Sequence, residues 1–253
     1  MRNTAQTDKA IRHTAVMAVD YAADIDYSAM HSHIILPADM EGEQKKKGTP
    51  RILFTDCALY DAVLRHGGEH ALCVIEASHF TPGNGFMQGK MTEEAKFCHH
   101  SNLYNIEALR QDYYSDQEKY RNSKLYRDIA LYIPKIRIES DNRSGYAGVL
   151  LSTPPNRQTY MRSKFAKDAN NFRALRNRIM FLKNIANSYS EQIDTLLIGA
   201  YGCRDFGQRP EEVAKCLADC FANCSMQRII VAVSSDNETI FEIFRTKFGE
   251  VVV

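Results

Sequence analysis

The chain has no tryptophan, no long apolar run and almost no excess of charge. Among its 253 residues, 32 are Lys or Arg and 31 are Asp or Glu, which gives a formal net charge of +1. The absence of any stretch of 18 apolar residues argues against a membrane-spanning helix. The balanced charge gives no reason to expect non-specific binding to a nucleic-acid backbone or an acidic membrane surface. An anionic ligand must therefore be held by local features.

Two further absences concern targeting and redox chemistry. The first 26 residues contain no apolar run of signal-peptide length. The seven cysteines are an odd number and include no CxxC pair. We therefore expect reduced thiols in a cytosol-like compartment, cytoplasmic or nucleoplasmic, and a chain that is not secreted.

Three of the cysteines, Cys216, Cys220 and Cys224, recur every fourth residue and share one face of a helix. Such a face forms either a metal or redox cluster or a row of small core side chains. No histidine lies nearby to complete a tetrahedral site, and the adjacent His99 and His100 point in different directions on a helix. We favour the core interpretation and predict neither a metal site nor a cofactor.

Short apolar runs alternate with amphipathic stretches along most of the chain. The predicted strands are 51–54, 71–77, 146–152, 195–200 and 228–234, and the predicted helices are 58–66, 92–100, 165–188, 210–223 and 236–247. This alternation predicts an α/β fold with helices on both faces of a largely parallel sheet. Ligands of such sheets bind beyond the carboxyl ends of the strands.

The N-terminal part differs from this pattern. Residues 1–30 look helical, and the charged segment EGEQKKKGTP at 41–50 is typical of an exposed connection. We predict a helical extension and charged linker over 1–50 and a core over 51–253, together forming a single domain.

Local signals mark several helices. The helix 165–188 carries an apolar stripe that begins at Phe165, and its opposite face, with Arg173, Arg176, Arg178 and Lys183, is predicted to be solvated. Ser235 and Glu238 form a capping-box pattern before the last helix. Pro210 is suited to be a first helical residue.

Six of the 13 glycines fall in two segments that each follow a predicted strand. The first segment reads PGNGFMQG at 82–89, and the second reads GAYGCRDFG at 199–207. Glycine allows positive φ and close approach of backbone N–H groups to an anion. The two loops are either the two sides of a diphosphate site or ordinary tight turns, and composition alone does not decide between them. Neither loop has the Rossmann or P-loop spacing.

A tandem acidic pair follows the first loop. Thr92 is a plausible N-cap, so Glu93 and Glu94 occupy the first turn of a helix, where acids complement the helix dipole. Alternatively, one carboxyl faces the loop, and burial raises its pKa so that it serves as a general acid on a glycosidic oxygen.

The arrangement of residues 82–85, six intervening residues and then 92–94 resembles the Gly-Gly-Gly…Gln-Glu-Glu signature of the poly(ADP-ribose) glycohydrolases of the microbial type. The resemblance continues through Cys98 and the segment SNLY at 101–104, resumes at TPPNR (153–157), and resumes again at 197–207 and Pro210. Order and spacing of the four segments agree over about residues 70 to 245, whereas the first 50 residues match loosely.

The resemblance implies a macrodomain-like three-layer α/β/α sandwich with a mixed, largely parallel sheet. It implies cleavage of the ribose–ribose O-glycosidic bond of poly(ADP-ribose), with release of ADP-ribose. Glu94 is the implied acid/base and Glu93 the residue that positions the ribose, while Phe206 stacks on the adenine. The residues expected to bind ADP-ribose are Gly83, Asn84, Gly85, Phe86, Thr92, Gly199, Gly202, Cys203, Arg204, Asp205, Phe206 and Gly207.

The sequence departs from the family pattern at four positions in or near this site. Asn84 replaces the middle glycine, although Asn tolerates a left-handed backbone. Thr92 replaces a Gln, and Ile75 stands where relatives tend to carry an Asn. Arg204 replaces a glycine, and it either pairs with a phosphate or fills the pocket and pairs with Asp205.

The substrate of the implied enzyme is poly(ADP-ribose) or another ADP-ribosylated macromolecule, and the product is ADP-ribose. We expect a monomer without a membrane partner. The alternatives are a hydrolase of another ADP-ribosyl linkage, on protein or nucleic acid, and an ADP-ribose-binding macrodomain without turnover. Retention of both Glu93 and Glu94 argues against a reader, which needs no carboxylate near an anionic ligand.

Overall fold

The computed structural model describes residues 4–40, 48–118, 124–249 and 251. Its helices are α1 (Thr4–Asp20), α2 (Ala22–His31), α3 (Leu59–His66), α4 (Glu93–His100), α5 (Leu103–Leu109), α6 (Gln111–Glu118), α7 (Arg157–Tyr160), α8 (Asp168–Ser188), α9 (Pro210–Phe221) and α10 (Glu238–Phe248), with 3₁₀ turns η1 (Pro37–Met40) and η2 (Pro82–Gln88). Its strands are β1 (His33–Ile35), β2 (Arg51–Thr55), β3 (Ala71–Glu76), β4 (Ala130–Ser140), β5 (Arg143–Ser152), β6 (Thr195–Ile198) and β7 (Arg228–Ala232).

The strands form a sheet in the order β1-β4-β5-β3-β6-β7-β2. Strands β5, β3, β6, β7 and β2 pair in parallel, and β1 and β4 extend one side of the sheet in antiparallel pairing. The mixed, largely parallel sheet confirms the predicted fold class. It also brings the carboxyl ends of β3, β6, β7 and β2, and the loops that follow them, to one edge.

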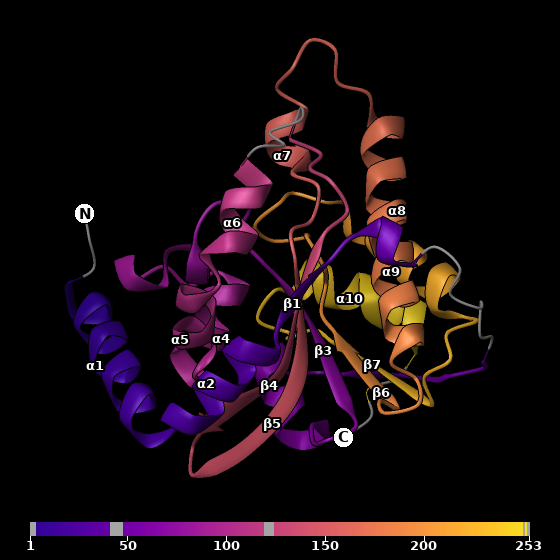
Figure 1. Ribbon diagram of the computed structural model, residues 1–253. Helices are drawn as coiled ribbons and strands as arrows, with labels where there is room; N and C mark the ends of the chain where they lie inside the picture. Colours follow the sequence, from indigo (N-terminus) through magenta and orange to yellow (C-terminus); the bar gives the residue numbers. More distant parts are fainter. Residues whose placement is uncertain (1–3, 41–47, 119–123, 250, 252–253) are drawn as a thin grey trace.

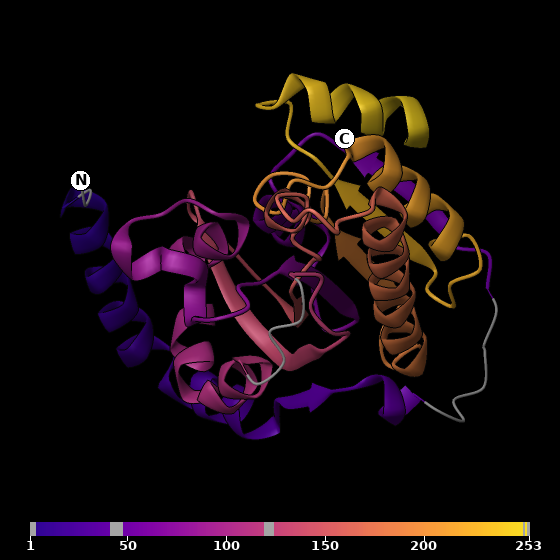
Figure 2. The same ribbon diagram turned by 90° about the horizontal axis from the view of Figure 1, so that it is seen from above.

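Helices cover both faces of this sheet. Figure 2 shows α1, α2 and α4 to α6 on one side and α8, α9 and α10 on the other, and Figure 1 shows α7 beyond the end of β5. Alternate residues of one strand enter opposite cores: Leu72 and Val74 pack with α8 and α9, whereas Cys73 and Ile75 pack with α4 and α5. Strand β3 is buried on both faces, which explains its continuous apolar sequence.

All five predicted strands exist, but two strands were missed. Strand β1 has only three residues, too few for a periodic signal. Strand β4 alternates apolar and polar residues from Ile136 onward, yet it contains Pro134, which argues against a strand. The structure accommodates Pro134 at an irregularity of the β4–β5 register between Ile133 and Ile136.

The helix predictions need three corrections. The last helix is capped by Asn237, which accepts a hydrogen bond from the Ile240 N–H, and not by Ser235. Phe165 precedes α8 and is 88% exposed, so it is no part of a buried stripe. Arg178 is fully buried and pairs with Asp128, so the prediction that it is solvated was wrong. The prediction that Pro210 begins a helix is confirmed.

The N-terminal segment contributes to the sheet as well as flanking it. Helices α1 and α2 confirm the predicted helical character, and β1 pairs with β4. Most of the predicted charged linker, residues 41–47, lies outside the described residues. The division at residue 50 stays a prediction.

The three regularly spaced cysteines are part of the core, as expected, although Cys224 lies beyond the end of α9 and not on its face. Cys216, Cys220 and Cys224 are buried among the apolar residues between α8, α9 and the sheet. Within the described ranges there is no cluster of three His, Cys, Asp or Glu side chains suited to a metal ion. In the same part of the chain, no helix has the length and apolar character that crossing a bilayer requires.

Candidate active site

A cleft lies at the carboxyl edge of the parallel strands. It encloses about 540 Å³ of space, including the open solvent at its mouth. Main-chain and apolar walls come from the ends of β2, β6 and β7, and five charged side chains face the cleft. These charged residues are Glu76, Glu93, Lys96, Arg204 and Asp236. An apolar cleft with a few convergent polar groups at this edge is the usual site of a small ligand in an α/β protein.

The first glycine-rich loop forms the turn η2 beside this cleft. Gly83, Asn84 and Gly85 have consecutive positive φ values of 67°, 45° and 88°. Asn84 thus adopts the left-handed backbone that the sequence analysis expected it to tolerate. At Gly83, a side-chain Cβ would lie 2.9 Å from the Tyr104 ring, so this position requires glycine for space as well as for φ.

Helix α4 follows the loop and presents the two tandem acids to different surroundings. Thr92 is the N-cap, as predicted, and its hydroxyl accepts a hydrogen bond from the Ala95 N–H at 3.3 Å. Glu93 lies in the cleft wall, whereas Glu94 is fully buried behind it. Adjacent helical residues point about 100° apart, which explains why the pair divides between the cleft and the interior.

Burial controls the protonation of both acids. Burial raises the pKa of Glu93, although Lys96 and Arg204 act in the opposite direction. Burial raises the pKa of Glu94 to about 8, despite a hydrogen bond of 2.5 Å from the Ser78 N–H to its Oε2 atom. At neutral pH, Glu94 is therefore mainly a neutral carboxylic acid, the form that a proton donor requires.

A third carboxyl lies beside Glu94. Glu107 of α5 is fully buried, and its Oε2 atom accepts a hydrogen bond of 2.7 Å from the Gly83 N–H. Burial and the Glu94 carboxyl raise the pKa of Glu107 well above its usual range. Glu107 is not among the residues predicted from the sequence, although its place beside Leu103 and Ile106 on one face of a helix was a signal.

The second glycine-rich loop also has a buried carboxyl beneath it. Glu76, the last residue of β3, accepts a hydrogen bond of 2.5 Å from the Gly202 N–H. Burial and the nearby Glu93 raise the pKa of Glu76 to about 8. The signal that could have identified Glu76 is a lone acid at the end of a strand that is otherwise apolar.

Arg204 of this loop contacts the loop that follows β7, and both loops line the cleft. Its guanidinium pairs with Asp236, which follows β7, at 2.6 Å. Of the two possibilities for Arg204 left open above, the pair with Asp205 is replaced by this pair with Asp236, and pairing with a phosphate stays a prediction. No sequence signal pointed to Asp236.

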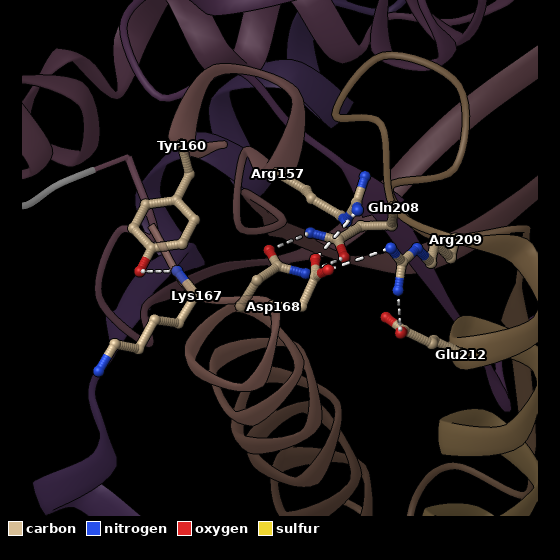
Figure 3. A network of polar contacts seen from close by, with 8 residues as sticks. Arg157, Tyr160, Lys167, Asp168, Gln208, Arg209 and Glu212 are labelled. Atoms are coloured by element: carbon tan, nitrogen blue, oxygen red, sulfur yellow. Dashed lines mark hydrogen bonds and ion pairs between the residues drawn. The ribbon is translucent and has the colours of Figure 1, made fainter. Parts of the chain in front are cut away.

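Polar contacts hold the second loop from behind. Gln208 bonds to Asn171 through both of its amide atoms, at 2.9 and 3.0 Å, and to the Pro155 carbonyl at 2.6 Å. Asp168, at the start of α8, pairs with Arg157 and with Arg209, as Figure 3 shows. These contacts connect helices α7, α8 and α9 to residues 208 and 209, which follow the second loop.

The predicted binding residues fall into two groups. Glu93, Gly199 and Arg204 line the cleft. The other predicted binding residues do not line the cleft: Phe86 packs on His99 and Tyr104, and the Phe206 side chain is only 7% exposed. The structure thus brings the tandem acids and both loops to one edge of the sheet, but it does not place the Phe206 ring in the cleft wall.

Comparisons with known proteins agree with this geometry. A family model described as "Microbial-type PARG, catalytic domain" matches residues 4–139, where PARG denotes poly(ADP-ribose) glycohydrolase. A search of curated protein sequences gives no match.

Solved structures share the whole fold. The poly(ADP-ribose) glycohydrolase of Thermomonospora curvata, bound to the inhibitor ADP-HPD, is similar with a TM-score of 0.83 and 21% identity, covering 97% of this chain and 100% of that chain. The enzyme of Deinococcus radiodurans in complex with ADP-ribose is similar with a TM-score of 0.78 and 20% identity, covering 88% and 96%. Since the family model spans more than half of its residues, the chain belongs to the family of microbial-type poly(ADP-ribose) glycohydrolases.

Proposed function

We propose that the protein hydrolyses the ribose–ribose O-glycosidic bond of poly(ADP-ribose) and releases ADP-ribose, with Glu94 as the acid/base. The observation that supports this most directly is the divided carboxyl pair of α4. One acid, Glu93, lies in the cleft wall, and the other, Glu94, is buried and mainly neutral beside the glycine-rich loop. Family membership gives the substrate class.

The substrate lies along the cleft at the carboxyl edge of the sheet in this proposal. The ADP part faces the ends of β2, β6 and β7, and the terminal ribose lies at α4. The relative from D. radiodurans was solved with ADP-ribose, and the one from T. curvata with ADP-HPD. A glycoside hydrolase needs a proton donor for the leaving oxygen and a group that holds the sugar.

The two acids supply these functions. The Glu94 carboxyl donates its proton to the ribose oxygen of the leaving group as the C1″–O bond breaks. A water oxygen then forms a bond to C1″, and its proton passes to the Glu94 carboxylate, which restores the starting acid. Glu93, exposed to the cleft, accepts hydrogen bonds from ribose hydroxyls and fixes the ring.

Paired variants test the assignment. We expect Glu94→Gln to lower kcat on purified poly(ADP-ribose) by about 100-fold or more, since general acid catalysis contributes at least this much. Calorimetric binding of ADP-ribose should persist. Glu93→Gln should raise KM more than Glu94→Gln does, because Glu93 contacts the ribose.

Glu211→Gln is the matched control. Glu211 is also an acid in the first turn of a helix, but it is exposed and lies on α9. Its replacement should change neither binding nor release. Full release of ADP-ribose by Glu94→Gln contradicts the proposed role of Glu94.

A second candidate is hydrolysis of another ADP-ribosyl linkage, on protein or nucleic acid. The ion pair between Arg204 and Asp236 favours it, because this pair stands at the cleft where family members carry a glycine. ADP-ribose release from mono-ADP-ribosylated protein, without release from the polymer, identifies this activity in the same assay.

We further infer a reducing, cytosol-like compartment and a monomeric state. All seven cysteines are buried and free, which supports the first inference. Size-exclusion chromatography with light scattering tests the second.

A further inference from the structure

Three buried carboxyl groups accept hydrogen bonds from backbone N–H groups in or before the two glycine-rich loops, and the proposed mechanism uses only one of them. Glu94 contacts Glu107 of α5 and Tyr114 of α6, while Glu76 lies beneath the second loop. Glu107 differs from the other two because it contacts both the proposed acid and the backbone of the first loop.

The contacts of Glu107 come from several separate elements. Its Oε2 atom accepts the Gly83 N–H of η2 at 2.7 Å, and the Cys98 Sγ atom of α4 lies 3.9 Å from the same oxygen. The titratable groups of the described residues that face Glu107 are Glu94 and Cys98 on α4, Tyr114 on α6 and Tyr104 on its own helix. None of these groups is a cation, so no positive charge compensates an ionised Glu107.

Unpartnered oxygen atoms show where a proton must lie. The Oε1 atoms of Glu94 and Glu107 are buried and have no hydrogen-bond partner, and the same holds for the neighbouring hydroxyl of Tyr114. Two ionised carboxylates cannot bond to each other, and buried polar atoms without partners are rare. A proton held between the two carboxyl groups satisfies both oxygens and removes the repulsion of two like charges.

We propose that Glu107 is a positioning residue that shares a proton with Glu94 and thereby fixes both the proposed catalytic acid and the glycine-rich loop. This inference rests on the proposed function for its kinetic consequences, although the shared proton itself does not. Both carboxyl groups are protonated before the reaction starts, and the shared proton is that of Glu107, which keeps it throughout. The proton that reaches the leaving oxygen comes from Glu94, and the attacking water replaces it.

Two substitutions separate positioning from simple filling of space. Glu107→Gln retains an N–H donor toward Glu94 and an oxygen acceptor for the Gly83 N–H, so it mimics the protonated acid. Glu107→Leu fills a similar volume but has neither group. We expect Glu107→Gln to retain most of kcat near neutral pH and Glu107→Leu to lower kcat by about tenfold or more, with ADP-ribose binding unchanged.

The pH dependence of kcat distinguishes a positioning role of Glu107 from a purely structural one. Loss of the hydrogen bond from Glu107 destabilises the ionised form of Glu94, so the alkaline limb of kcat should shift to higher pH in Glu107→Leu and stay in place in Glu107→Gln. Cys98→Ala is the control, since it removes the other side chain that contacts the Glu107 oxygen. It should leave the profile unchanged. Unchanged kcat and pH profile in a folded Glu107→Leu protein overturn the proposal.

Infrared spectroscopy tests for the shared proton directly, without measuring enzyme activity and without the Glu107→Leu variant. Infrared difference spectra of wild type and Glu107→Gln at neutral pH should show loss of a carbonyl band of a protonated carboxylic acid. The absence of such a band overturns the shared proton even if the enzyme is active. If the band is present but poly(ADP-ribose) is not cleaved, the proposed function is wrong, whereas the proton shared by Glu94 and Glu107 is supported.

Discussion

The two glycine-rich loops have similar composition but differ in what their glycines face. The loop at η2 turns its left-handed residues toward the side chains of Tyr104 and Lys90 and packs against α4. The loop after β6 contributes Gly199 and Arg204 to the cleft itself. One loop therefore determines where the proposed acid lies, and the other forms the ligand surface.

In each loop, one backbone N–H group already donates a hydrogen bond to a buried carboxyl group. Glu107 accepts from Gly83 and Glu76 accepts from Gly202. A backbone N–H group that is held by a resident acid is not free for a phosphate oxygen unless that acid moves. The loops thus differ from an open phosphate-binding turn, in which the N–H groups await the ligand.

The largest effects are expected when a methyl group is added to each loop. Gly83→Ala places a Cβ 2.9 Å from the Tyr104 ring at φ 67°, and Gly202→Ala places one 2.9 Å from both Pro154 and Gln208 at φ 79°. We expect Gly83→Ala to lower kcat and Gly202→Ala to weaken ADP-ribose binding, each by about tenfold or more, since misplaced catalytic or binding groups have effects of this order.

Gly68→Ala is the matched control for those two variants. Gly68 also has positive φ, at 136°, but a Cβ there meets nothing within 4 Å. It should lose stability through backbone strain without a change in kcat or affinity. If Gly83→Ala weakens ADP-ribose binding and leaves kcat intact, the roles assigned to the two loops are wrong.

A second prediction uses the pH dependence of stability. An unfolded glutamate releases its proton near pH 4.5, whereas the pKa of folded Glu76 is about 8. Between these values the folded state holds more protons, so the free energy of unfolding falls as pH rises, by about 1.4 kcal/mol per pH unit for each such group. Glu76→Gln should remove one group's contribution to this slope, measured by urea denaturation from pH 5 to pH 8. An unchanged slope contradicts the raised pKa of Glu76.

The smallest predicted effect concerns the ion pair at the cleft. Arg204 and Asp236 have side chains that are 30% and 57% exposed, so breaking the pair should change stability by less than about 1 kcal/mol.

Asp236→Asn frees Arg204 for the diphosphate and should tighten ADP-ribose binding a few-fold at low salt, whereas Arg204→Ala should weaken it. Arg245→Ala removes an exposed pair with Glu242 far along α10 and should change neither. Equal affinity in all four proteins shows that Arg204 does not contact the ligand.

The sequence predicted β2, β3, β5, β6 and β7 in order, because burial on both faces gives a parallel strand a continuous apolar run. It predicted α3, α4, α8, α9 and α10 from their periodic apolar faces, but it missed β1, β4 and helices α5 to α7. It also located the tandem acids and both glycine-rich loops, since positive φ and N-capping restrict the residue types at single positions. The Thr92 cap and the left-handed Asn84 follow from such local rules.

Tertiary structure decided what these residues contact. That Glu94 is buried while Glu93 faces the cleft depends on how α4 packs against β3 and α5. The partners Glu107 and Asp236 come from elements that only the fold brings to the site, and Arg178 is buried because Asp128 and backbone carbonyls surround it. Charges are determined in the same way, because a pKa depends on burial and on neighbours that are distant in sequence.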